Sequence, residues 1–254
     1  MANSSCTNST DRNKEENLYE SWMNNQQEEL KELQNAVALA RKNERNDAEL
    51  NELLGKMVNN FQGYVNGRSR LVRVDVSPFF APTWCTPLEN SVLWIGGCRP
   101  SSFIRLIYAH CGIEIEFHLK EYLQGIKIHD FGQLCGKQII MIDKLQRQII
   151  GEERKLSSRL ASLQEDVVDQ PIAKAAKNCD TQEGENENEP LNKHGHNMAN
   201  LLEEADELRM NTLKEILGIL TPIQGVEYLA AAKRIRLCLQ QWGKKREQEH
   251  SSNN

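Results

Sequence analysis

Apolar residues recur at helical spacing through much of the sequence, and this periodicity constrains the fold more than any other feature. The clearest case is a stripe whose members are 3, 4, 7, 4, 3 and 4 residues apart: Ile142, Leu145, Ile149, Leu156, Leu160, Leu163 and Val167. Glu152 stands at the position that the longest step skips, and Gly151 beside it would weaken or bend the helix slightly. The stripe predicts one long amphipathic helix. Its apolar face is either the core side of an antiparallel bundle, which we favour, or a dimer seam.

Similar patterns predict further helices along the chain. They cover residues 17–45, 46 to about 63 or 67, 87–95, 101–108, 114–124, 200–219 and 222–242. Thr86-Pro87 and Thr221-Pro222 each place an N-cap threonine before a proline at the first helical position. Because strand-like alternation and hairpin turn pairs are missing from the sequence, it predicts an all-α fold, a multi-helix bundle with one long central helix.

The segments between these helices differ in composition. Residues 68–86 contain the run SPFFAPTWCTP, which predicts an ordered aromatic and proline-rich connecting loop. We expect residues 1–13 to be a disordered N-terminus, residues 14–243 to form one helical domain, and residues 244–254 to be a disordered tail. Within the domain, residues 169–198 are polar and acidic, which predicts a flexible linker.

Composition and charge narrow the class of protein. The chain has 254 residues and a formal net charge of -5, so general affinity for polyanions is not expected. Its seven cysteines are scattered and odd in number, which favours reduced thiols in the nucleus or cytoplasm. The N-terminus lacks the apolar stretch of a secretory signal, and the sequence has no apolar run long enough to cross a membrane.

Motifs that carry chemistry are missing from the sequence. The glycine cluster WIGGCRP lacks the lysine and the preceding strand of a phosphate-binding loop, so we interpret it as a turn that ends a helix. The histidines and cysteines show no short-spaced ligand pairs, which argues against a structural metal. Cys111 follows His110 directly, and adjacent helical side chains do not face each other as a catalytic pair must. We therefore predict no catalytic residue, no cofactor and no metal, and a protein that is not an enzyme.

Two other groups of residues leave alternatives open. A late basic cluster predicts a solvated face or a nuclear-import patch rather than specific DNA reading: Lys233, Arg234, Arg236, Lys244, Lys245 and Arg246. The loop aromatics Phe79, Phe80 and Trp84, together with Trp94, either plug the core, which we favour, or form a partner-binding face. Arg99 is expected to donate to carbonyl groups at a nearby helix end.

Three blocks of the sequence resemble one plant family. The segment PTWCTPLENSVLWIGGCRPSSFIRLIYAHCG (82–112) resembles the hallmark stretch of the Delay-of-Germination family, which is related to the C-terminal domain of TGA-type bZIP transcription factors. SWMNNQQEELKELQNAV (21–37) is similar to the family's opening helix, and LTPIQGVEYLAAAKRIRLCLQQWG (220–243) to its closing helix. Together the blocks span about residues 17–243.

The resemblance implies a helical regulatory domain without catalytic activity, acting in seed dormancy and germination. It implies protein partners, with type 2C protein phosphatases and bZIP transcription factors as candidates, and a role in transcription regulation in the nucleus or cytoplasm. The TGA relatives bind DNA through a basic zipper ahead of this domain, and we expect that part to be absent here. Direct DNA contact is therefore the less favoured alternative, as is a small apolar ligand between residues 92 and 108; a homo-oligomer is compatible with the pattern.

The matching blocks supply the candidate residues for structure or interaction. These are Trp22, Trp84, Pro87, Glu89, Trp94, Gly96, Gly97, Arg99, Pro100, Pro222, Gln224 and Trp242. The sequence departs from one family pattern: some members carry two histidines in the closing helix, suited to haem iron, where this chain has Arg236 and Gln240. Since a charged arginine cannot bind the metal, haem is not expected there.

Overall fold

The computed structural model describes residues 5–42, 46–109, 134–169, 173 and 188–252. Its long helices are α1 (Ser5–Arg41), α2 (Asp47–Val72), α6 (Gly136–Glu165), α8 (Asn188–Ile219) and α9 (Pro222–Ser252). Shorter elements are α3 (Ser77–Phe80), α4 (Pro87–Asn90) and the 3-10 helix η1 (Asp166–Val168), and residues 101–109 are also helical. The described residues form no strand, so the prediction of an all-α fold is confirmed.

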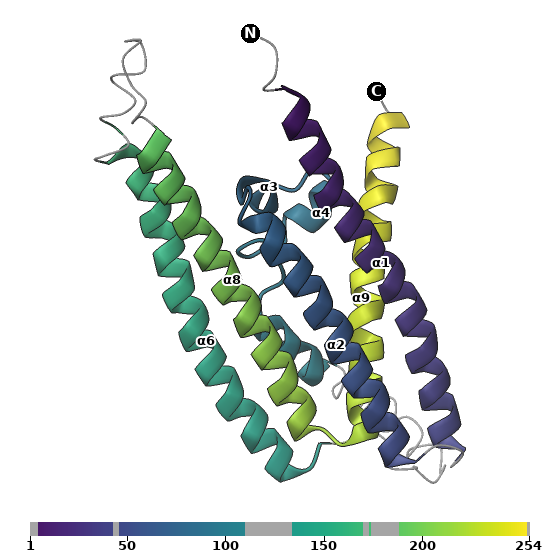
Figure 1. Cartoon of the computed structure of the whole chain (residues 1–254). Coiled ribbons are helices and arrows are strands. Elements are labelled where there is room, and N and C mark those ends of the chain that lie inside the picture. Colours follow the sequence, from purple (N-terminus) through teal and green to yellow (C-terminus); the bar gives the residue numbers. More distant parts are fainter. Residues whose placement is uncertain (1–4, 43–45, 110–133, 170–172, 174–187, 253–254) are drawn as a thin grey trace.

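The long helices lie side by side along one direction (Figure 1). α6 and α8 form an antiparallel pair on one side of the molecule, α1 and α9 lie on the other, and α2 runs between them (Figure 1). The long helix at the centre is therefore α2. α6, which carries the apolar stripe, packs against α8 at the outer edge. None of the described helices combines the length and apolar character needed to cross a membrane.

Two apolar clusters form the core. The first gathers residues from every long helix and from 101–109, among them Leu33, Leu50, Ile104, Ile142, Ile216 and Val226. The second lies around the C-terminal end of α2 and the N-terminal half of α8, and it includes Val72, Phe79, Ile95, Leu156, Leu201 and Leu202. The stripe on α6 thus contributes to both clusters, which supports the interpretation as a core face. Its last member, Val167, is 45% exposed because it lies in η1, beyond the end of the α-helix.

Several helices extend beyond the expected bounds. α1 begins at Ser5, within the segment predicted to be disordered, and α9 continues to Ser252 through most of the predicted tail. α8 begins at Asn188, inside the predicted linker. Extending an existing helix adds a hydrogen bond for each residue ordered, so polar segments can continue a helix that core packing has already nucleated. The rest of the predicted linker, apart from residues 169 and 173, and the predicted helix 114–124 lie outside the described residues.

α2 also runs through both glycines that were expected to end it. Its start is as predicted, since the Asn46 side chain accepts from the Glu49 backbone N–H at 3.0 Å. At Gly67, an added methyl group would lie 3.1 Å from Leu18 Cδ1 of α1. The glycine therefore serves the close approach of two helices rather than a helix end.

Candidate functional site

The family motif contains a tight turn where the sequence predicted the end of a helix. α4 stops at Asn90, although its start is as expected, with a capping box between Thr86 and Glu89. The chain then turns back at residues 94–97: Trp94 N donates to Gly97 O at 2.7 Å and Gly97 N to Trp94 O at 3.1 Å. Both central residues have positive φ, 43° at Ile95 and 64° at Gly96. A β-branched residue rarely adopts this conformation, and burial of the Ile95 side chain in the second cluster holds it there.

Arg209 of α8 holds the turn in place through hydrogen bonds to backbone carbonyl oxygens. Its side chain is fully buried and donates to the carbonyl oxygens of Cys98 at 2.7 Å, Trp94 at 2.5 Å and Ile95 at 2.9 Å. Asp206 accepts from Arg209 at 2.6 Å, and so balances its charge. One guanidinium thus donates to three carbonyl oxygens in and just after the turn, of which the Trp94 oxygen also accepts from Gly97 N.

Arg68 of α2 completes this arrangement from a second helix. Its Nε donates to Asp206 at 2.9 Å and its Nη1 to the Gly96 carbonyl oxygen at 2.7 Å. The turn is therefore held by two buried arginines that share one buried aspartate. We call Arg68, Asp206 and Arg209 the turn anchor. Sequence reasoning missed all three, because charged residues on helical patterns are usually exposed.

Arg99 does not have the role predicted for it. Its Nε donates to Glu153 Oε2 of α6 at 2.7 Å, while Arg209 and Arg68 donate to the backbone carbonyls. The second Glu153 oxygen accepts from Ser101 N at 2.6 Å, at the start of helix 101–109, and Pro100 is buried beside it. Glu153 thus caps a helix and neutralises an arginine at once. The acidic residue that is buried on α6 is therefore Glu153. Its neighbour Glu152 is the residue that stands at the skipped position of the apolar stripe.

The aromatic residues of the motif pack against the second cluster. Phe79 is buried, and the Trp84 ring packs edge-on against it, with 5.8 Å between the ring centroids. Trp94 is partly buried, donates from Nε1 to Ser157 Oγ at 2.9 Å, and lies 5.5 Å from the Arg209 guanidinium. These contacts are those of core-plugging aromatics.

A second polar cluster joins α4 to α1 and α9. Glu89 is 1% exposed and accepts from Tyr19 Oη at 2.5 Å, from Thr86 at 2.9 Å and 3.0 Å, and pairs with Arg236 at 3.1 Å. Burial raises the pKa of Tyr19, and the Glu89 carboxylate adds to the rise while Arg236 opposes it, so the phenol stays protonated. We call Tyr19, Glu89 and Arg236 the Glu89 cluster. Close by, a methyl group at Gly243 would lie 2.0 Å from Thr86 Oγ1, so α9 needs a glycine at this point.

Of the two positions that stand in place of paired histidines, Arg236 belongs to this cluster and Gln240 contacts it. The Arg236 guanidinium lies over the rings of Trp22 and Tyr19, at 5.2 Å and 5.6 Å from their centroids, and Gln240 donates to Tyr19 Oη at 3.5 Å. Over the described parts of the chain, no three histidine, cysteine or acidic side chains are grouped as a metal site would need.

Burial also changes the interpretation of the basic cluster. Lys233 is buried and donates to Glu29 at 2.5 Å and to Gln26 at 3.1 Å, and Asn60 of α2 donates to the other Glu29 oxygen at 2.6 Å. Burial lowers the pKa of Lys233, and Glu29 counteracts part of that shift. With Lys233 inside and Arg236 in the Glu89 cluster, four of the six cations remain for a solvated face.

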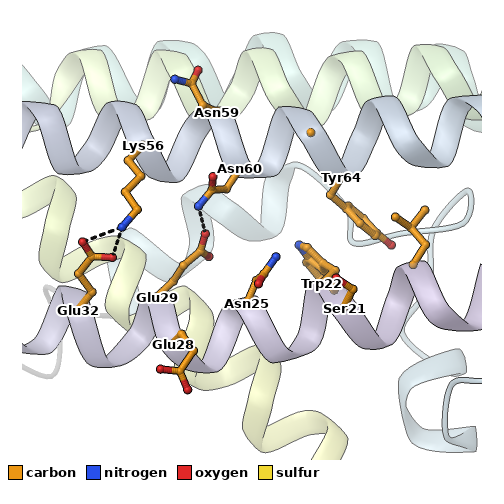
Figure 2. Close-up of a pocket in the computed structure, with 12 residues that line it drawn as sticks. Ser21, Trp22, Asn25, Glu28, Glu29, Glu32, Lys56, Asn59, Asn60 and Tyr64 are labelled. Carbon is orange, nitrogen blue, oxygen red and sulfur yellow. Dashed lines mark hydrogen bonds and ion pairs between the residues drawn. The ribbon is translucent and has the colours of Figure 1, made fainter.

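A shallow groove lies between α1 and α2 (Figure 2). It has a volume of about 550 Å³, and half of the residues that line it carry amides or carboxylates, with Lys56 bonded to both oxygens of Glu32 across it. At one end Trp22 stacks on Tyr64 with 4.5 Å between ring centroids (Figure 2). The acidic side chains that line it already have partners, namely Glu28 with Lys31, Glu29 with Lys233 and Glu32 with Lys56.

The remaining candidates lie on α9. Pro222 begins the helix, and the Gln224 side-chain oxygen accepts from Thr221 N at 2.9 Å and from Gln138 of α6 at 2.8 Å. Trp242 is 57% exposed. The structure therefore brings together Trp94, Gly96, Gly97, Arg99 and Pro100 at the turn. It places Trp22, Pro87 and Glu89 around the α1–α4–α9 contact, and it leaves Trp242 apart from both.

Comparison with known proteins shows the family of the chain. A family model described as "DOG1: Seed dormancy control" matches residues 29–109, which include the turn and the Glu89 capping box. Protein DOG1-like 3 of Arabidopsis thaliana is 41% identical over 239 residues, covering 91% of this chain and 84% of its own length. Protein DOG1-like 2 of the same plant is 40% identical, covering 90% and 89%. Transcription factor TGAL6 of Oryza sativa is a more distant relative, 27% identical over 84% of this chain and 48% of its own length. The chain belongs to the DOG1 family of seed dormancy control.

Proposed function

We propose that this protein is a non-enzymatic regulator of seed dormancy and germination that acts by binding other proteins. The observation that carries the proposal is its 41% identity to Protein DOG1-like 3 across 91% of the chain. Identity at this level over nearly the full length favours a shared role as well as a shared fold.

The use of the buried charges supports a role without catalysis. Catalytic sites gather ionisable groups around a cleft where a substrate can reach them. Here Arg68, Asp206 and Arg209 hold a backbone turn, Glu153 caps a helix, and Lys233 pairs with Glu29 between helices. These groups bond to one another and to the backbone, which is the pattern of structural networks.

Type 2C protein phosphatases and bZIP transcription factors are the partners that the family resemblance favours. The relationship to Transcription factor TGAL6 supports an action on transcription through partners, in the nucleus or cytoplasm. Direct DNA binding is less favoured, because Lys233 and Arg236 are occupied inside the protein and four cations give a small phosphate-binding face.

Affinity capture from developing seeds tests the partner class. The tagged chain should enrich type 2C phosphatases or bZIP factors over the tag alone, with mass spectrometry as the readout. Recovery of neither class above that control would contradict the proposal of action through these partners.

A further inference from the structure

α9 has an apolar face that the bundle leaves uncovered. Its inner side packs against α1, α2 and α4, with Val226, Leu229 and Lys233 buried. On the outer side, Ile235 is 53% and Trp242 57% exposed. Leu239, which is partly buried, lies between them, four residues after one and three before the other, so the three side chains form one row along the helix. We call Ile235, Leu239 and Trp242 the α9 row.

An exposed row of this kind needs an explanation that core packing does not give. Scattered single apolar residues on a surface are ordinary, but a tryptophan and an isoleucine two turns apart on one helix face are the anchors by which helices recognise each other. Tryptophan is also the residue most enriched at the energetic centres of protein interfaces. Substitution of Trp242 would cost the isolated fold little, since most of the ring is in solvent.

The charge around the row indicates what would cover it. From Tyr228 to Arg246 the sequence contains six basic residues and no acidic one, in a chain of net charge -5. Two of the six are occupied inside the protein, as described above. Arg234 and Arg246 are exposed at the two ends of the row, and Lys245 is 75% exposed, with a loose 3.8 Å contact to Glu249 beyond the end of the row. The rim of the row is therefore positive.

We propose that the α9 row is a docking surface for an amphipathic helix with an acidic rim, presented by a partner protein. The apolar face of that helix would lie over Ile235, Leu239 and Trp242, and its carboxylates would meet Arg234, Lys245 and Arg246. This inference rests on the proposed function, and it assigns the partner contact to a face separate from the turn and from the α1–α2 groove.

A protein occupant fits the row better than nucleic acid or a lipid surface. Phosphate contacts would use the cations but would leave Trp242 and Ile235 in water. Membrane-bound helices insert a wide apolar face, whereas α9 offers one row of side chains on a helix already packed into the bundle.

The test is binding of a designed helical peptide, followed by fluorescence anisotropy. The probe has about 18 residues, with leucines at helical spacing on one face and glutamates along both edges. We expect the wild-type chain to bind it, and Ile235→Ser/Trp242→Ser to weaken binding about tenfold or more. Arg234→Gln/Arg246→Gln should weaken it by a smaller factor that shrinks as salt is added. Val74→Ser/Val168→Ser, at valines that are 71% and 77% exposed elsewhere, is the matched control and should bind as the wild type does.

Each other outcome overturns the inference. These are no binding of the peptide, equal binding of a version with lysine edges or a shuffled sequence, and equal binding by Ile235→Ser/Trp242→Ser. Tighter binding of a DNA duplex or of phosphatidylserine vesicles through the same residues would assign the face to those ligands. Self-association by sedimentation velocity that the double variant abolishes would assign it to a second copy of this chain. A failed peptide test leaves the proposed function standing, because partner capture and seed phenotype do not depend on which face is used.

Discussion

Gly97 lies directly against the Arg209 guanidinium: a methyl group at residue 97 would come within 2.8 Å of Arg209 Cζ. The double glycine of the family motif therefore has a structural explanation. Gly96 provides a positive φ of 64°, and Gly97 leaves the space in which a buried arginine reaches three carbonyl oxygens.

Gly97→Ala should consequently destabilise the protein by about 1–3 kcal/mol, as overpacking does, because the arginine must move away from its carbonyl partners. Gly151→Ala is the matched control, since an added methyl group in the middle of α6 meets nothing within 4 Å. It should raise stability by about 0.5–1 kcal/mol through helix propensity. Urea unfolding measures both changes. Equal free energies of unfolding for Gly97→Ala and the wild type would show that the turn does not depend on this contact.

Arg209→Met should destabilise the fold more strongly, by about 3–5 kcal/mol, since it removes the hydrogen bonds that Arg209 donates to Asp206 and to three backbone carbonyl oxygens. Arg70→Met, on the exposed side of α2, serves as the control and should stay within about 0.5 kcal/mol of the wild type. Thermal unfolding followed by circular dichroism is the measurement. Similar melting temperatures for the two variants would contradict the anchoring role of Arg209.

Trp94 contributes through both its ring and its indole N–H. Trp94→Ala should cost on the order of 3 kcal/mol, while Trp94→Phe keeps most of the packing and should cost about 1 kcal/mol for the lost bond to Ser157. Trp242→Ala should be nearly neutral, because that ring is mostly in solvent. The ranking of the three variants in chemical unfolding checks the assignment; a Trp242→Ala loss as large as that of Trp94→Ala would refute it.

Lys233 gives the protein a specific pH dependence. Its pKa is lowered in the folded state, so over alkaline pH the unfolded chain binds more protons at this site than the native one. The site's contribution to stability therefore increases as the pH rises from the folded pKa to the unfolded value, and stays level above it. In Lys233→Met that increase should be missing. The titration of the tyrosines changes the stability of the wild type and the variant equally. Unfolding free energies compared between about pH 8 and pH 10 provide the test; parallel curves would mean that the pKa of Lys233 is not lowered.

The sequence predicted the parts of this structure that depend on neighbouring residues. Helical periodicity predicted the apolar stripe on α6. Local capping signals predicted the helix starts after Asn46, Thr86 and Thr221. These features involve residues within a few positions of one another, so a single sequence reveals them.

What the sequence did not reveal depends on distant partners. Arg209 reaches the Cys98 carbonyl across 111 positions, and Arg68 reaches Asp206 across 138. The turn at Ile95 follows from those contacts rather than from local preference, which is why the helix was expected to continue to it. Arg99 was expected to donate to these carbonyls because it adjoins the glycines, while the arginines that do so, Arg209 and Arg68, lie on α8 and α2.

The central claim is that this family member regulates seed dormancy, and germination of freshly harvested seed tests it most directly. We predict that plants lacking the protein germinate at a different frequency from the parent line, and that the wild-type chain restores the parental frequency. Identical germination of the two lines, across a series of storage times after harvest, would contradict the claim.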